Sequence, residues 1–316
     1  MGTAEVLVQE GLETELHERL EQLRLLLDLD GVEGQGRTPD SLRRYFEESR
    51  LGYHLVHSRA GAMHMALNPE GEFDEAGYAA QADLISERLP PGTRDVLELA
   101  SGVGFNLELM ARMWPEVRFA GIDLVPEHVS QANDKFSALA NVSAAVGDFH
   151  HLLLGDATFD AVFSIEGFGY AGDLSRALTE LRRVLRPDGL FIVVDGWRTD
   201  TFSQKPADLR AGAEYMETSM AVAYPWELSA WKSAVIDADF EIVEELDLTD
   251  QVMPNLTRLA EITERRFISH PRRARILRKC LPASLVTNAI AGYLMPLTVQ
   301  LGLYTYRMVV LTRPEA

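Results

Sequence analysis

The most informative segment of the chain reads Val96-Leu97-Glu98-Leu99-Ala100-Ser101-Gly102-Val103-Gly104-Phe105-Asn106. Its first five residues are apolar apart from one acid, which is typical of a buried strand, and two glycines then introduce a helical pattern. Glycines at such a turn let the backbone approach a ligand, and the helix that follows presents free N–H groups. In an open α/β sheet, ligands bind beyond the carboxyl ends of the strands. We therefore expect a ligand site at this turn.

Acidic residues indicate the chemistry of that ligand. A dinucleotide-binding turn would need a third glycine at position 107, which is a leucine. Instead, Glu98 precedes the glycines, and an acid there suits a positively charged ligand better than a pyrophosphate. Asp123 closes the next predicted strand, where its carboxylate can accept hydrogen bonds from ribose hydroxyls. Asp148 closes the third, where it can accept from an adenine amino group while Phe149 or Ile122 packs on the ring. These acids favour a cationic nucleoside without a phosphate.

Short apolar runs alternate with amphipathic helical patterns from residue 94 onward. This alternation predicts an α/β fold, with a parallel sheet covered by helices on both faces. Strands are expected over 96–100, 117–123, 142–146, 159–165, 190–195, 241–248 and 304–311, with helices over 106–114, 126–139, 174–185 and 225–238. Further helices are expected over 1–35, where glycines at 31, 34 and 36 end the pattern, from the start Thr38-Pro39-Asp40-Ser41, and over 75–89.

Residues 94–196 resemble the class I S-adenosylmethionine-dependent methyltransferases. The acid-x-Gly-x-Gly-x-Gly motif of that family matches Glu98, Ala100, Gly102 and Gly104, with Ala100 in place of the usual first glycine. The stretches 159–162 and 185–189 resemble the family's fourth strand and the turn before its fifth. This resemblance implies a Rossmann-like, seven-stranded, mostly parallel sheet and S-adenosyl-L-methionine as cofactor. The cofactor-binding residues that it implies are Glu98, Ala100, Gly102, Gly104, Asn106, Asp123, Leu124, Asp148 and Phe149.

The rest of the chain resembles the sterol, tocopherol and geranyl-diphosphate methyltransferase subgroup. The stretch 45–64 is similar to the lid that precedes the core in that subgroup, and 246–254 is similar to the segment that opens its substrate-capping insertion. This likeness implies four parts: a helical N-terminal extension and lid at 1–89, a cofactor-binding core at 90–250, a helical cap inserted between strands six and seven at 251–303, and the last core strand at 304–316.

Candidate catalytic residues follow from the reaction that the resemblance implies. Methyl transfer from a sulfonium is an in-line displacement, so positioning and water exclusion dominate. Methylating an alkene makes a carbocation, which aromatic faces stabilise and a carboxylate can deprotonate. Glu166, after the fourth strand, is either that base or a structural contact. His64 and Tyr45 are candidates for orienting the acceptor or relaying a proton. Residues that either line an apolar acceptor pocket or pack in the core are Trp197, Tyr215, Met216, Tyr224 and Trp226.

We therefore expect a methyltransferase that acts on a small hydrophobic natural product. The preferred hypothesis is C-methylation of an alkene in a terpenoid-like secondary metabolite, with the same carbocation available for cyclisation. O- or N-methylation, with His64 or Glu166 as base, is the alternative. A third hypothesis is a S-adenosylmethionine-binding protein without transferase activity, which only Ala100 favours. No grouping of His, Asp and Glu has metal-ligand spacing, although a diphosphate acceptor could bring Mg²⁺ with it.

The charge of the chain limits its partners. It carries 48 acidic and 30 basic residues, and this net charge of −18 excludes nucleic acid as a general partner. One cysteine, Cys280, rules out an intramolecular disulfide, and the first residues lack a signal-peptide pattern, so a cytoplasmic location is expected. Three interpretations of the basic run 265–279 are open: it forms a solvated helix face, it contacts an anionic group of the acceptor, or it makes a peripheral contact with a membrane. The uncharged stretch 280–306 is expected to form a buried cap helix rather than a transmembrane segment. A homodimer is left open.

Overall fold

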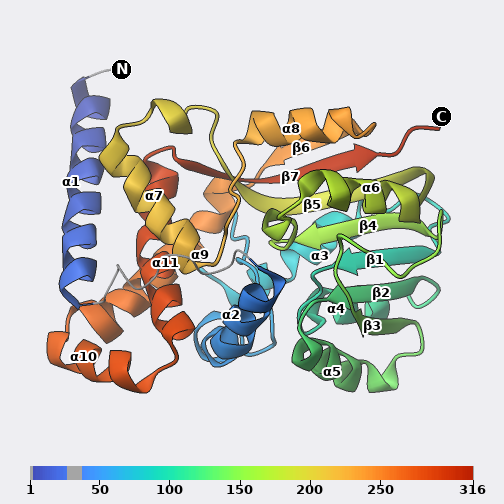
Figure 1. The fold of residues 1–316 in the computed structure, drawn as a ribbon, viewed down its shortest axis with the longest axis horizontal. Helices are drawn as coiled ribbons and strands as arrows, with labels where there is room; N and C mark the ends of the chain where they lie inside the picture. Colours follow the sequence, from blue (N-terminus) through green and yellow to red (C-terminus); the bar gives the residue numbers. More distant parts are fainter. Residues whose placement is uncertain (1–2, 27–37, 316) are drawn as a thin grey trace.

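One seven-stranded sheet forms the centre of the protein. The structure, a computed structural model, describes residues 3–26 and 38–315 (Figure 1). The strand order is β3-β2-β1-β4-β5-β7-β6, in which β7 is antiparallel to β5 and β6 and the other pairs are parallel. The strands are β1 Asp95–Leu99, β2 Arg118–Asp123, β3 Val142–Val146, β4 Phe159–Ile165, β5 Leu185–Arg198, β6 Glu241–Asp247 and β7 Tyr304–Thr312. The predicted Rossmann-like, mostly parallel sheet is confirmed.

Helices cover both faces of the sheet, because successive side chains of a strand point to opposite faces. On β1, Val96 belongs to one apolar cluster and Leu97 to the other, and both are fully buried. The first cluster includes α3 (Ala80–Ser86), α4 (Phe105–Met113) and α5 (Pro126–Lys135), and the second includes α6 (Leu174–Val184) and α8 (Leu228–Asp237). The apolar run at the start of the glycine turn therefore supplies both cores.

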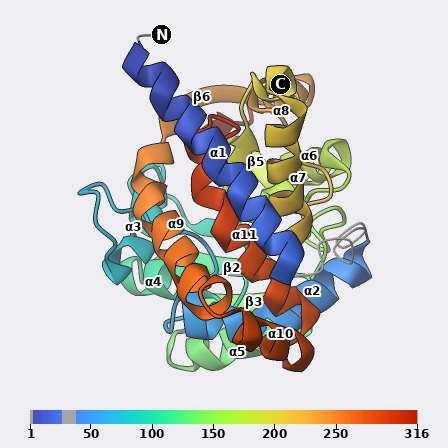
Figure 2. The same cartoon turned by 90° about the vertical axis from the view of Figure 1, so that its left-hand side faces the viewer.

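A group of helices lies beside the sheet. Its members are α1 Thr3–Leu26, α2 Pro39–Gly52, α7 Ala207–Ser219, α9 Thr249–Thr263, α10 Pro271–Cys280 and α11 Ala283–Gln300. Helix α11 contacts α1, α2, α7 and α9, and Figure 2 shows α1 crossing in front of it. The uncharged stretch of the sequence forms α11, whose Ile290, Leu294 and Leu297 are buried. Within the described ranges, no helix is long and apolar enough to cross a membrane.

Helix α7 was not among the predicted elements. Its residues Leu209, Ala213 and Met216 are buried and recur at helical spacing. They join the apolar cluster that also contains residues of α1 and α11, and a Cβ at Gly212 would lie 3.0 Å from the Leu16 side chain. The spacing of these three residues is therefore a helical signal that the sequence itself carries.

The N-terminal elements agree with the sequence in part. Helix α2 begins where expected: the Thr38 hydroxyl accepts from the Ser41 N–H (3.2 Å), and Pro39 occupies the first turn. The predicted helix over 75–89 is a short 3₁₀ helix, Glu75–Tyr78, followed by α3. The glycines expected to end the first helix lie outside the described residues.

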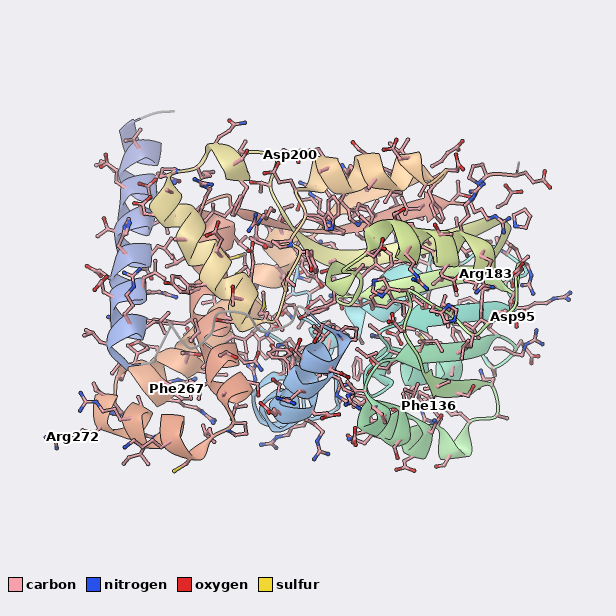
Figure 3. The ribbon with its side chains drawn as sticks, in the orientation of Figure 1. Asp95, Phe136, Arg183, Asp200, Phe267 and Arg272 are labelled. Atoms are coloured by element: carbon pink, nitrogen blue, oxygen red, sulfur yellow. The ribbon has the colours of Figure 1, made fainter. Side chains whose placement is uncertain are left out.

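The glycine turn has no room for a side chain at Gly104. A Cβ there would lie 2.4 Å from the ring of Phe136, which Figure 3 labels at the end of α5, and Gly104 has φ +75°. We expect Gly104→Ala to destabilise the fold by about 2–4 kcal/mol, because left-handed strain and a clash add together. Gly71→Ala is the matched control, since φ is +82° but nothing lies within 4 Å; about 1–2 kcal/mol is expected from strain alone. Urea denaturation measures both, and equal losses would contradict the clash.

Candidate active site

A cavity opens where the glycine turn meets the ends of the central strands. It is lined by the backbone of this turn, by residues after β2, β3 and β4, and by Thr38, Pro39, Leu42 and Phe46 at α2. The predicted cofactor residues that line it are Glu98, Ala100, Gly102, Asn106, Asp123, Leu124, Asp148 and Phe149. Gly104 does not line the cavity; it is the N-cap residue of α4. The structure thus brings eight of the nine predicted residues to one cavity.

Glu98 has one carboxylate oxygen without a partner. Its Oε1 accepts from Asn106 Nδ2 (3.1 Å), whereas Oε2 is buried and has no hydrogen-bond partner among the described residues. Burial raises the pKa of Glu98 well above its ordinary value, and the nearby Asp123 raises it further. A positively charged group in the cavity would satisfy Oε2 and favour the ionised carboxylate. The site therefore fits a cationic nucleoside such as S-adenosylmethionine.

Asp123 ties the glycine turn to the end of β2. Its Oδ2 accepts from the Gly102 N–H (2.8 Å) and its Oδ1 accepts from the Val125 N–H (2.9 Å). The side chain is buried, yet it lines the cavity. The same Oδ1 lies 3.3 Å from His128 Nδ1, so Oδ2 has room for one further hydrogen bond and Asp123 can hold a hydroxyl while it fixes the turn.

Asp148 and Phe149 form the far rim of the same cavity. Asp148 Oδ1 accepts from the His150 N–H (2.9 Å) and lies 2.6 Å from His150 Nδ1. The Phe149 ring packs 5.7 Å from the ring of Phe168. One oxygen of Asp148 therefore already has partners, and an adenine amino group would meet the other. His150 also lines the cavity, whereas His151 is exposed.

Glu166 lies at the end of β4 and faces two cavities. Its backbone has φ +48° and its N–H donates to Val194 O (2.8 Å), which fixes the direction of the side chain. Its Oε1 accepts both from the Met65 N–H (2.6 Å) and from the Tyr306 hydroxyl (2.6 Å). Burial raises the pKa of Glu166 to about 7, against these two hydrogen bonds, which lower it. Glu166 is therefore ready to gain or lose a proton near neutral pH.

A second cavity extends from Glu166 toward the helices beside the sheet. It is lined by residues of β5, β7, α7, α9 and α11, and shares Glu166, Gly169, Tyr170 and Tyr224 with the first cavity. Four of the five predicted pocket residues line it, namely Trp197, Met216, Tyr224 and Trp226. Tyr215 does not line it. The walls are mainly apolar and aromatic, and those residues come from segments far apart in the sequence.

The sequence did not identify two polar residues of the second cavity. Asp195 accepts from the Gly169 N–H (2.9 Å) and from its neighbour Gly196 (2.8 Å), and burial raises its pKa to about 6. Tyr306, on β7, donates to Glu166. Asp195 ends the predicted fifth strand, so the reasoning applied to Asp123 could have found it. Tyr306 carried no comparable signal.

His64 and Tyr45 occupy different places. His64 is buried in the wall of the first cavity, with Nδ1 3.1 Å from Met65 O and Nε2 3.2 Å from Asn106 Oδ1. Burial lowers the pKa of His64 to about 4, so the ring is neutral at pH 7. Tyr45 donates to the Asn288 amide oxygen and lines neither cavity; its ring packs on Phe46, which does. The catalytic roles of both stay predictions.

Comparisons with known proteins agree with this geometry. A family model described as a methyltransferase domain matches residues 96–189. The S-adenosyl-L-methionine-dependent Diels-Alderase iccD of Talaromyces variabilis is 25% identical, over 68% of this chain and 77% of its own length. Several other curated relatives are matched over about half of their length.

Two solved structures share the fold across most of the chain. The [4+2]-cyclase SpnF has a TM-score of 0.72 and 17% identity, with 88% of this chain and 98% of that chain covered. A geranyl diphosphate methyltransferase in complex with its diphosphate and sinefungin has a TM-score of 0.65 and 18% identity, covering 87% and 98%. The domain match over residues 96–189, the sheet and the cavity at the glycine turn agree: this part of the chain is a methyltransferase domain of the class I, S-adenosylmethionine-dependent kind.

Proposed function

We propose that the protein transfers the methyl group of S-adenosylmethionine to an alkene carbon of a small apolar acceptor, and that Glu166 removes a proton from the resulting carbocation. The observation that carries this proposal is the position of Glu166 between the two cavities. Four described residues line both cavities, and Glu166 is the carboxylate among them. The first cavity would hold the cofactor through Glu98 and Asp123, and the second would hold the acceptor.

The electrons and protons balance within the acceptor and Glu166. Bound S-adenosylmethionine supplies an electrophilic methyl group. The double bond of the acceptor gives its electron pair to the new carbon–carbon bond, which leaves a positive charge on the neighbouring carbon. The Glu166 carboxylate takes a proton from an adjacent carbon, and the electrons of that C–H bond form the new double bond. With a pKa of about 7, Glu166 is partly ionised at neutral pH and can act as this base.

The residues that line the second cavity suit an acceptor that is uncharged when it binds and becomes cationic during the reaction. Aromatic faces stabilise a positive charge, and Tyr170, Trp197 and Trp226 supply them. Among the described residues of this wall there are two carboxylates, Glu166 and Asp195, and no lysine, arginine or histidine. A related geranyl diphosphate methyltransferase was crystallised with Mg²⁺ and its diphosphate substrate. In the described ranges here, no three His, Cys, Asp or Glu side chains cluster to hold a metal ion, so we favour a neutral, terpenoid-like or polyketide-like acceptor over a diphosphate.

Cyclisation is the second candidate, because one similar protein is named a Diels-Alderase and another a [4+2]-cyclase. In that case the cofactor would form part of the cavity wall and the product would be an isomer of the substrate. The same carbocation could also link both reactions, with methylation followed by ring closure. O- or N-methylation is the further alternative, and it too would depend on Glu166, since His64 lines the cofactor cavity and not the second one.

An acceptor screen tests these candidates. The purified protein is incubated with methyl-labelled S-adenosylmethionine and apolar polyenes, sterols, polyketides and prenyl diphosphates. The proposal expects a labelled product with a new carbon–methyl bond from a neutral acceptor. An unlabelled isomer that also forms with S-adenosylhomocysteine would favour cyclisation, and a labelled ether or amine would favour heteroatom transfer. A labelled product from prenyl diphosphates alone would overturn the preference for neutral acceptors.

We also propose that α10 contacts anionic membranes in which an apolar acceptor dissolves. Two arginines of this helix, Arg272 and Arg273, are exposed, and Figure 3 shows Arg272 pointing away from the protein. On the same helix, the apolar side chain of Ile276 is 63% exposed. We expect the protein to sediment with phosphatidylserine-containing vesicles at low salt. The double variant Arg272→Ser/Arg273→Ser should lower the bound fraction by about threefold or more, because each basic residue near an anionic membrane adds roughly 1 kcal/mol to the binding free energy. The control pair Arg59→Ser/Arg112→Ser should leave it unchanged. Equal vesicle binding by the two double variants would contradict a membrane contact through α10.

A further inference from the structure

Glu166 belongs to a hydrogen-bonded ring whose other members come from β7, α3 and the segment before α3. The Tyr306 hydroxyl on β7 donates to Glu166 Oε1 (2.6 Å), and Gln81 Nε2 on α3 donates to the Tyr306 oxygen (2.7 Å). Gln81 Nε2 also donates to Met65 O (3.1 Å), while the Met65 N–H donates to Glu166 (2.6 Å). Four residues from four segments thus close a ring around one carboxylate oxygen.

We propose that Tyr306, oriented by Gln81, is a positioning residue that keeps Glu166 ionised and turns its free oxygen toward the acceptor. The effect of Tyr306 on catalysis rests on the proposed function. Its effect on the protonation of Glu166 does not, because that protonation can be measured without any acceptor. It assigns to β7 and α3, which carry no predicted site residue, a direct effect on the base.

The direction of each hydrogen bond follows from the partners. A backbone carbonyl can only accept, so the Gln81 atom that faces Met65 O is the amide nitrogen. The same nitrogen faces Tyr306, whose oxygen must therefore accept from Gln81 and direct its own hydrogen to Glu166. Burial raises the pKa of the Tyr306 phenol well above its ordinary value, so the phenol is protonated and donates at neutral pH.

The two donors on Oε1 leave Oε2 of Glu166 to meet the acceptor. Donors to a carboxylate favour its ionised form, whereas burial disfavours it. Among the titratable groups around Glu166, Asp195 raises its pKa, and the phenols that interact with it, Tyr53, Tyr78, Tyr170 and Tyr306, are uncharged at neutral pH. His64, whose Nδ1 lies 3.1 Å from Met65 O, is the basic side chain beside this ring in the described part of the chain, and burial lowers its pKa to about 4, so it too is neutral. The hydrogen bonds from Met65 and Tyr306 are therefore what offsets the burial of this carboxylate.

The test measures the protonation of Glu166 directly. Infrared difference spectra of the protein with S-adenosylhomocysteine are recorded against pH, and the carboxyl band that Glu166→Gln removes is assigned to Glu166. We expect Tyr306→Phe to raise the midpoint of that band by about one pH unit, because it deletes one donor. Gln81→Leu should shift it in the same direction by less. The matched control is Tyr304→Phe, which lines the same cavity but donates to Glu217, and the Glu166 midpoint should not move.

Activity gives a second and separable readout. With an accepted substrate, Tyr306→Phe should move the rise of the rate with pH toward alkaline pH by the same amount, and at pH 7 lower the rate about fivefold. An unchanged Glu166 midpoint in Tyr306→Phe, with the band still present, would overturn the inference. A shifted midpoint in a protein that methylates no acceptor would leave the inference standing and defeat the proposed function instead.

Discussion

Glu166→Gln is expected to slow methyl transfer by about 10²–10⁴-fold, the usual contribution of a positioned general base. The glutamine carbonyl can still accept from Met65 and Tyr306, so the shape of the site is retained. What is lost is the group that takes the proton from the carbocation. Single-turnover transfer of labelled methyl measures the effect, and calorimetry with S-adenosylhomocysteine should show affinity within about twofold of the natural protein, because the recognition groups Glu98 and Asp123 are intact.

The natural protein should also show the matching pH dependence. Burial raises the pKa of Glu166 to about 7, so the carboxylate forms, and the rate rises, as pH increases through about 7. Glu166→Gln should flatten this rise. Glu108→Gln, which removes a carboxylate paired with Arg112 on the surface of α4, is the control and should keep both rate and profile. Full methyl transfer in Glu166→Gln would contradict the assignment of Glu166 as the base.

Asp123→Ala is expected to weaken S-adenosylhomocysteine binding by about 10–100-fold. The remaining site on Oδ2 offers a hydrogen bond to a hydroxyl, which is worth about 1.5–3 kcal/mol for a charged acceptor before desolvation is deducted. The carboxylate also accepts from Gly102 and Val125, so its removal loosens the turn itself. Asp123→Asn keeps the shape and one acceptor and should lose less. Asp134→Ala, on the exposed side of α5, is the control for calorimetry; unchanged affinity in Asp123→Ala would remove the basis for the ribose contact.

The cofactor side was predictable from sequence because its signals are local. The run before Glu98 is apolar on both faces, which marks a parallel strand, and Gly102 and Gly104 mark the turn. Acids at the ends of successive strands must meet at one edge of a parallel sheet, whatever the details of packing. For this reason Asp123 and Asp148 could be placed beside Glu98 without knowledge of any long-range contact.

The second cavity, which is the proposed acceptor site, could be predicted only in part because its residues meet through tertiary packing. Tyr306 faces Glu166 because β7 inserts between β5 and β6, and neither its direction nor its neighbours can be read from the apolar run that contains it. Gln81 reaches the same point from α3. Tyr45 lies one residue from Phe46 at the first cavity, but its hydroxyl donates to Asn288, and this direction could not be predicted from the sequence. A helical period specifies a buried face, not the partner that covers it.

The separate origin of the two cavity walls has a consequence for how new substrates could be acquired. Met216 on α7, Leu256 on α9 and Met295 on α11 line the second cavity only, while the glycine turn and Asp123 line the first only. Saturation libraries at these three positions should therefore vary acceptor preference at nearly constant cofactor affinity. In such a protein, selection can change acceptor recognition while cofactor recognition stays the same. The helices beside the sheet are therefore the natural target for directed evolution.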